Sequence, residues 1–272
     1  MLPAILARLR AQPSRTGSLI ITLYGDAIAP RGGSLWLGTL LEIFRALDIG
    51  EGVVRTAVSR LAADGWLARV RQGRNSFYHL AERGQAETDA ATPRIYGALG
   101  AGVAGRFRLV LAEPAARQTL AHAGYGTLQP GVMLAPAEFP VPTQSGVLAL
   151  TAETDRATAR TLAARAWPLG DIAGRYAAFL SAFAENPGPL SDLDALLGRL
   201  LLIHEYRRAV LRDPHLPEDL LPPDWPGHAA RARCAALYGA LLPQSESWLD
   251  DHARDAHGPL PPADPVLGSR FG

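Results

Sequence analysis

Apolar and polar positions follow helical periodicity over three segments in the first quarter of the chain. In each segment the apolar residues recur three or four positions apart, which places them on one face of an α-helix. Proline and glycine at 30–33 end the first segment, and Ser34 is a suitable N-cap for the second. The pattern predicts helices at Thr16–Ile28, at Leu35–Leu47 and from Glu51 onward.

The third helix has two unlike faces, and a hairpin follows it. Its apolar stripe, which includes Val54, Val58 and Leu61, is expected to face a core, while the opposite side is polar and basic. Gly65 then fits the left-handed position after a helix C-terminus. Two short runs rich in aromatic and branched residues, joined by a glycine-containing turn, predict the hairpin over 66–80. Helix, helix, turn, helix and hairpin is the order of a winged helix-turn-helix.

Beyond the hairpin the pattern changes to that of a small α+β domain. A run of Ala, Thr, Pro and Gly at 86–99 predicts a linker. The elements after it follow a β-α-β-β-α-β-like order, which suggests a ferredoxin-like domain. They are strands at Arg106–Leu111, around Met133 and at Gly146–Leu150, and helices at Pro114–His122 and Thr154–Ala166.

The rest of the chain is predicted to be helical up to a proline-rich end. Apolar spacing predicts helices at Ile172–Ala184, Leu193–Arg212, Ala229–Leu241 and Gln244–His252, and Trp225 is expected to fill a core. The predicted fold class is therefore α+β. Its parts are an N-terminal winged helix-turn-helix domain at 1–88, a ferredoxin-like middle domain at 89–168, a C-terminal helical domain at 169–257 and a disordered tail at 258–272.

Composition narrows the class of protein. A length of 272 residues with 48% hydrophobic content suits about two globular domains. No apolar run reaches the roughly 18 to 20 residues that span a bilayer, and the N-terminus lacks a signal-peptide layout, so no membrane association and a cytoplasmic location are expected. The single cysteine, Cys234, is expected to be a small buried apolar residue.

Charge is unevenly distributed along the chain. The 27 basic residues are all arginine, because the sequence contains no lysine. Residues 1–166 carry 18 arginines against 12 acidic residues, whereas residues 167–272 carry 9 against 14. A weakly basic front half suits a protein that presents this half to a polyanion.

Residues with catalytic potential do not form a known catalytic arrangement. His204 and Glu205 begin the run HEYRR, but the zinc-protease pattern requires a second histidine where Arg208 stands. Glu113 has no second carboxylate close by to hold a hard cation. No catalytic residue, metal ligand or cofactor is therefore expected.

Four longer runs carry a resemblance to a known family. They are LYGDAIAPRGGSLWLG at 23–38, VRTAVSRLAADGWL at 54–67, LLIHEYRR at 201–208 and DPHLPEDLLPPDWPG at 213–227. Together they resemble the PaaX family of bacterial transcriptional repressors. The intervening segments agree in order and length, so the likeness covers nearly the whole chain. It implies a middle domain similar to the CRISPR spacer-acquisition nuclease subunits.

The resemblance also implies a function. PaaX-type proteins repress genes of phenylacetate catabolism and leave the DNA when they bind phenylacetyl-CoA. The expected partners are therefore double-stranded operator DNA, a second copy of the chain in a homodimer and an acyl-CoA effector. Two alternatives remain open, an acyl-CoA-handling enzyme and a nuclease, each fused to a DNA-binding domain. The DNA-binding residues are expected to be Arg55, Thr56, Ser59 and Arg60 on the third helix and Arg71, Arg74 and Asn75 on the hairpin.

An effector site requires cationic groups for the CoA pyrophosphate and an apolar pocket for the aryl group. The alternative for each candidate is a structural role, in which the aromatic rings belong to the core and the arginines pair with acids such as Glu205 and Asp171. The candidates are Arg106, Arg108, Trp167, Arg175, Tyr176, His204, Tyr206, Arg207 and Arg208.

Overall fold

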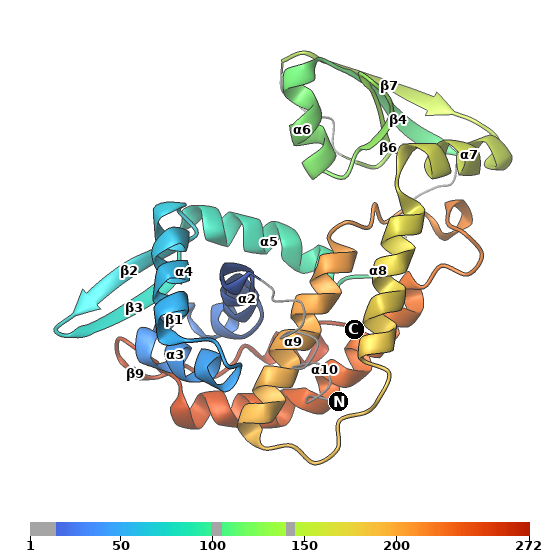
Figure 1. Ribbon diagram of the computed structural model, residues 1–272. Helices are drawn as coiled ribbons and strands as arrows, with labels where there is room; N and C mark the ends of the chain where they lie inside the picture. Colours follow the sequence, from blue (N-terminus) through green and yellow to red (C-terminus); the bar gives the residue numbers. More distant parts are fainter. Residues whose placement is uncertain (1–14, 99–104, 140–144) are drawn as a thin grey trace. The chain divides into compact units, whose positions relative to one another are not determined.

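The computed structural model describes residues 15–98, 105–139 and 145–272 (Figure 1). Within these ranges, no helix is both long enough and apolar enough to cross a membrane.

The chain folds as two compact units, each built from segments that lie far apart in the sequence. Helices α8 (Leu169–Ala182), α9 (Asp192–Val210) and α10 (Gly227–His252) each contribute residues to both units. Unit 1 comprises residues 1–97, 179–207 and 230–272, and unit 2 comprises residues 98–178 and 208–229.

The front of unit 1 combines three helices with a small antiparallel sheet (Figure 1). The second helix of this group packs against the third, α4, and the apolar stripes of the helices meet in one core. Tyr24 Oη donates a hydrogen bond to Tyr78 O at 3.0 Å and ties the first helix to the sheet. The elements are α2 (Thr16–Leu23), α3 (Leu37–Ala46), α4 (Glu51–Ala63), β1 (Ser34–Trp36), β2 (Leu67–Gln72) and β3 (Asn75–Leu80), with strand order β1-β3-β2.

Two predicted helices differ at their ends. Ser34 is not an N-cap, because Ser34–Trp36 forms β1 and helix α3 begins only at Leu37. The strand forms because Leu35, which is fully buried, lies opposite Tyr78 of β3. The predicted helix at Thr16–Ile28 has the right extent, but its end is wound as a π-helix, η1 (Tyr24–Ile28), followed by the 3-10 helix η2 (Ala29–Arg31).

The linker predicted at 86–99 is wrong for most of its length, because helix α5 spans Glu82–Tyr96. Alanine has the highest helix propensity of all residues, so the alanines of this segment favour a helix. The segment was predicted as a linker because its sequence shows no apolar stripe that could pack against a core. Ile95 and Tyr96 at the end of α5 are buried in unit 1. The helix therefore continues past the domain boundary predicted at residue 88.

The disordered tail predicted from residue 258 is also wrong. Leu260 and Leu267 are 6% and 3% exposed, and Leu260 N donates to Ala253 O at 3.1 Å. These apolar side chains stand among the prolines and anchor the segment, which composition alone did not reveal. The tail forms β9 (Gly258–Pro259), which pairs with β8 (Arg254–Asp255), and η4 (Pro265–Ser269). The predicted break after Leu241 is absent too, since α10 continues through Pro243.

A buried carboxylate joins four parts of unit 1. Asp26 lies in η1 and is 3% exposed. Arg199 Nε of α9 donates to its Oδ2 at 2.7 Å, and Tyr96 Oη of α5 and Tyr238 Oη of α10 donate to Oδ1 at 2.6 and 3.1 Å. Arg270 Nη1 of the tail donates to Oδ1 at 3.3 Å. Because burial and then Asp26 raise the pKa of Tyr96, this phenol stays protonated and remains a donor.

The same arginine extends the network to the surface of unit 1. Arg199 Nη1 donates to Glu246, which also accepts a 2.7 Å hydrogen bond from Nε of Arg31. Arg31 Nη1 donates to Asp250 Oδ1 at 2.8 Å. Burial alone would lower the pKa of Arg199, but Asp26, Tyr238 and Glu246 raise it above its ordinary value. The guanidinium is therefore charged and compensated inside the core.

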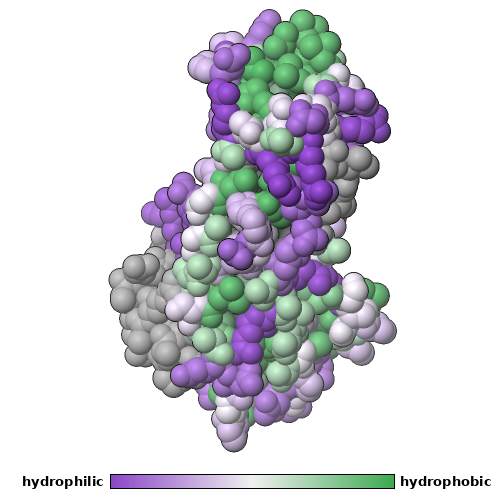
Figure 2. Space-filling model, turned by 90° about the vertical axis from the view of Figure 1, so that its right-hand side faces the viewer, coloured by the Kyte–Doolittle hydropathy of each residue, from purple (hydrophilic) through white to green (hydrophobic). Residues whose placement is uncertain are grey.

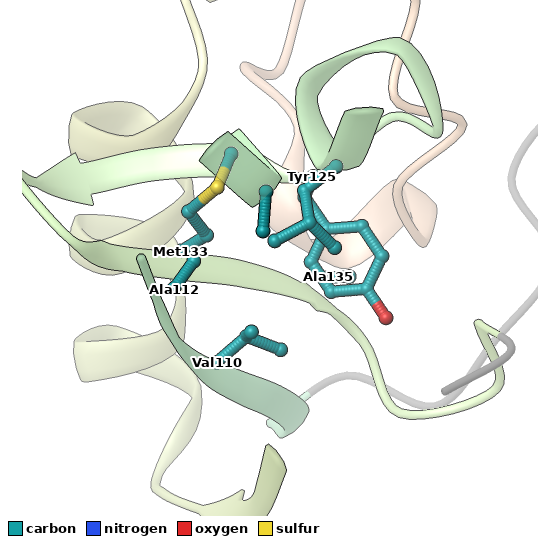
Figure 3. Close-up of a cluster of buried hydrophobic side chains, with 7 residues drawn as sticks. Val110, Ala112, Tyr125, Met133 and Ala135 are labelled. Atoms are coloured by element: carbon teal, nitrogen blue, oxygen red, sulfur yellow. The ribbon is translucent and has the colours of Figure 1, made fainter. Parts of the chain in front are cut away.

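Unit 2 is centred on a four-stranded antiparallel sheet of order β5-β6-β4-β7. Helix α6 covers one face, where Val110, Met133 and Ala135 pack with Ala116 and Leu120 of the helix (Figure 3). On the other face Gly126 has no room for a side chain, because the Trp167 ring occupies that space. The elements are β4 (Arg106–Ala112), α6 (Pro114–His122), β5 (Gly126–Gln129), β6 (Val132–Pro136), β7 (Val147–Glu153), α7 (Arg156–Ala166) and η3 (Glu218–Leu220).

The elements predicted between Arg106 and Ala166 occur in the predicted sequence, with α7 after the strand at 146–150. The one strand predicted around Met133 is two strands, β5 and β6, so the order is β-α-β-β-β-α and not β-α-β-β-α-β. Asp155 explains where α7 begins, because its carboxylate accepts hydrogen bonds from the amides of Ala157 and Thr158 and caps the helix. Trp225 fills a core as predicted, since it is 7% exposed and its ring centroid lies 5.9 Å from that of Tyr176.

Candidate nucleic-acid interface

Helix α4 is held by its apolar face and leaves the opposite face open. Val54, Val58 and Leu61 are at most 8% exposed. Gly50 stands before the helix in extended conformation, and its carbonyl accepts from the amide of Val54 at 3.2 Å. Gly65 ends the helix at φ +73°, which confirms the predicted left-handed position. The predicted residues Arg55, Thr56, Ser59 and Arg60 are all exposed on the open face.

The first turn of α4 carries an ion-pair cluster that the sequence pattern did not predict. Glu51 accepts a hydrogen bond from Arg45 of α3 and lies 3.6 Å from Arg55 Nη2. The hydrogen bond from Arg45 is the main cause that lowers the pKa of Glu51. All three side chains are exposed, so the pairs are weak and can exchange for contacts with phosphate. Arg45 therefore joins the basic side chains near α4.

The hairpin adds three arginines, Arg69, Arg71 and Arg74, and each has a different local environment. Arg69 donates to Ser76 Oγ at 2.7 Å across the two strands, so its guanidinium is tethered to the hairpin. Arg71 Nε donates to Gly73 O at 3.2 Å at the turn. Gly73 has a φ of +59°, which permits the tight connection to Arg74. The predicted residues Arg71, Arg74 and Asn75 are all exposed.

This arrangement suits a phosphate-bearing duplex. Arginine presents a planar fork of donors that matches phosphate oxygens and the O6 and N7 atoms of guanine. An α-helix fits the major groove, while a hairpin beside it can contact the backbone. The described residues contain no group of three or more His, Cys, Asp or Glu side chains placed to hold a metal ion.

Four of the predicted effector residues of unit 2 are engaged in contacts within that unit. Arg106 Nε lies 3.1 Å from Glu153 Oε1, and Arg108 donates to the carbonyl oxygens of residues 137 and 139. Trp167 Nε1 donates to the carbonyl oxygen of residue 124 at 3.0 Å. Tyr176 is fully buried and donates to Asp213 Oδ2 at 2.8 Å. Arg175 and Arg208, in the same unit, are exposed.

The remaining three effector candidates belong to the core of unit 1. Arg207 Nη1 donates to Thr22 Oγ1 at 2.8 Å, and His204 Nδ1 lies 3.2 Å from the same oxygen. Since the Thr22 hydroxyl donates its hydrogen to Ser18 O, the histidine is the donor in this contact. Tyr206 is fully buried with its ring 5.4 Å from that of Phe179. The structure thus divides the nine candidates between the two units.

Unit 1 contains an open cavity of about 550 Å³ that the sequence did not indicate. Thr88, Thr92 and Tyr96 line it from α5, and Leu267 and Arg270 line it from the tail. None of the nine predicted effector residues lines this cavity. Tyr96 and Arg270 both also contact Asp26, so the wall of the cavity is continuous with the buried network behind α2.

The basic helix and hairpin occur in a chain that matches two family descriptions. Residues 15–84 match the family described as PaaX-like protein, and residues 167–251 match the PaaX-like protein C-terminal domain. The chain is 35% identical over 289 residues to the transcriptional repressor PaaX of Escherichia coli (strain K12), an alignment that covers 96% of this chain and 92% of that protein. The chain therefore belongs to the PaaX family.

A solved structure shares the fold. An uncharacterized protein from Mycobacterium tuberculosis superimposes with a TM-score of 0.53 over 77% of this chain and 89% of its own, at 23% sequence identity. The similarity extends over most of both chains and concerns the fold alone.

Proposed function

We propose that this protein is a transcriptional repressor of phenylacetate catabolism genes that binds double-stranded operator DNA as a homodimer. The observation that carries the proposal is the exposed basic surface formed by α4 and the hairpin, in a chain whose E. coli relative is a transcriptional repressor. In this reading the front of unit 1 is a winged helix-turn-helix. The antiparallel strand order of unit 2 supports a ferredoxin-like middle domain, and α8 to α10 form the C-terminal helical part.

The proposed contact of each side chain with DNA follows from its position. Arg55 and Arg60 on α4 reach base edges or phosphates in the major groove, and Arg71, Arg74 and Asn75 contact the backbone. A bidentate pair between arginine and guanine contributes roughly 1 to 3 kcal/mol of discrimination between bases. Phosphate contacts add affinity that does not depend on sequence and that decreases with salt.

Exposed leucines on the β4–β7 side of the sheet face opposite α6 support the choice of a second copy as partner. Leu148 and Leu150 of β7 are 69% and 56% exposed, and Leu111 of β4, directly opposite Leu148, is 42% exposed. The hydrophobic area at the top of Figure 2 lies over this unit. Exposed apolar surface of this kind favours association, and β7 stands at the edge of the sheet.

Selection of binding sites from a random DNA library tests both parts of the proposal. The wild-type protein should enrich an inverted repeat, because a two-fold dimer reads two half-sites. The double variant Leu148→Glu/Leu150→Glu should sediment as a monomer and enrich at most a single half-site. Thr151→Glu on the same strand, whose side chain points to the opposite face, is the control and should remain dimeric. Absence of any enriched sequence with the wild type would overturn the repressor function.

The proposed effector is phenylacetyl-CoA, and the cavity of unit 1 is its proposed site. Its volume of about 550 Å³ is within the range of small-molecule pockets, and its open side leaves space for the remainder of a larger ligand. Because Tyr96 and Arg270 line the cavity and contact Asp26, a bound ligand could act on the segment that follows α2. The nine residues named from the sequence stay candidates for this role elsewhere in the chain.

Calorimetry with phenylacetyl-CoA, phenylacetate and acetyl-CoA tests the effector, and a cavity-filling variant tests the site. Thr92→Trp should leave operator affinity unchanged while weakening phenylacetyl-CoA binding by at least about tenfold, since the indole would occupy the space. Glu87→Trp, on an exposed position of the same helix outside the cavity, should behave as wild type. Failure of all three ligands would exclude the proposed effector and leave DNA binding unaffected.

A further inference from the structure

We infer that Val53 reads the 5-methyl group of a thymine in each operator half-site, an inference that rests on the proposed DNA-binding function. Val53 is in the first turn of α4 and is 55% exposed. It precedes Thr56 by three residues and Arg60 by seven, so the three side chains form one row on the open face of the helix. The row places an apolar group among residues predicted to meet base edges.

Gly52, the neighbour of Val53, is also a residue with low helix propensity. Gly52 is exposed, and a Cβ built on it would have no atom within 4 Å, so intramolecular packing does not account for the glycine. Both residues disfavour a helix relative to alanine, glycine through backbone entropy and valine through its restricted side chain. A missing side chain here allows another molecule to approach the helix backbone closely.

The groups on this row that are available to contact DNA are partly apolar. Thr56 Oγ1 donates its hydrogen to Gly52 O at 2.8 Å, so this hydroxyl does not donate to a base while that bond is intact. On this row Thr56 can still accept a hydrogen bond through its oxygen, and the apolar groups exposed at the start of the helix are the Thr56 methyl and the two methyls of Val53, the more N-terminal residue. In the major groove the thymine methyl is the one apolar group on a base edge, and apolar side chains recognise it.

A double-mutant cycle between protein and DNA tests the assignment. Each thymine of the selected operator is replaced in turn by deoxyuridine, which removes only the 5-methyl group, and the dissociation constant is measured for wild type and for Val53→Ala. At one position per half-site, deoxyuridine should weaken wild-type binding by about fourfold, as expected for one buried methyl group. The same replacement should have no further effect on Val53→Ala. Thr161→Ala, at an exposed position of α7 in unit 2, is the control and should retain the wild-type pattern.

The outcomes separate this inference from the function on which it rests. If every deoxyuridine weakens Val53→Ala as much as wild type, the inference is overturned while the repressor function stands. If wild type binds no selected operator, the repressor function itself fails. Gly52→Ala should unfold at the same temperature as wild type or higher and should bind the operator more weakly. Unchanged affinity in that variant would contradict the close approach at the first turn.

Discussion

Replacing Asp26 with alanine should lower the free energy of unfolding by about 3–5 kcal/mol, because it leaves the buried guanidinium of Arg199 without its main partner. Tyr96 and Tyr238 would lose their acceptor at the same time. For a chain of this length, a loss of this size should decrease the melting temperature by roughly 6 to 20 °C. Thermal unfolding followed by circular dichroism measures the shift.

An exposed ion pair provides the matched control. Arg106 and Glu153 are 52% and 69% exposed in their side chains, so Glu153→Ala should cost at most about 1 kcal/mol. Asp26→Asn, which preserves the shape of the side chain and one oxygen acceptor, should destabilise less than alanine does. Equal melting temperatures for Asp26→Ala and Glu153→Ala would show that the buried network does not stabilise unit 1.

The double variant Arg60→Ala/Arg74→Ala should bind operator DNA far more weakly than wild type. Arg60 is on α4 and Arg74 is at the hairpin turn, so one substitution removes a groove contact and the other a backbone contact. Loss of a guanine pair at Arg60 should cost about 1 to 3 kcal/mol. Loss of the phosphate contact of Arg74 should reduce the slope of log K against log salt by about 1. Fluorescence anisotropy over a range of salt concentrations measures both effects.

The controls for this experiment separate loss of contact from loss of charge. Arg165→Ala removes an exposed arginine from α7 in unit 2 and should leave both affinity and salt slope unchanged. Melting temperatures of the variants should match that of wild type, since Arg60 and Arg74 are exposed. Unaltered affinity for the double variant would remove the assigned face from the DNA-binding surface.

Periodicity predicted the elements whose packing is local. The helices around Leu23, Phe44 and Val58 and the hairpin after Gly65 lie where their apolar spacing and turn glycines indicate. The failures concern segments stabilised by distant partners. Helix α5 has few apolar residues, but Tyr96 at its end is buried against Asp26, which lies 70 residues away in sequence. Periodicity contains no information about such pairs, since it reports only local amphipathicity.

For a related reason, the sequence predicted the exposure of the DNA-binding candidates but not the contacts of the effector candidates. Polar residues opposite an apolar stripe are exposed by geometry, so the open face from Arg55 to Arg60 followed directly from spacing. Val53 was missed because an apolar residue is assigned to a core until its exposure is known. The effector candidates were chosen by residue type. Their contacts, such as that of Arg207 with Thr22, depend on tertiary structure that residue type does not encode.

The partners of Asp26 have a consequence for biosynthesis. Arg199, Tyr238 and Arg270 leave the ribosome long after the first helices, although all three contact this early carboxylate. A nascent chain that has produced only the front of unit 1 would bury an acid without its cations, which is unfavourable. We therefore expect the front of unit 1 to complete its folding only after Arg270 has been synthesised. Prematurely terminated chains would then not occupy operators in competition with the intact protein.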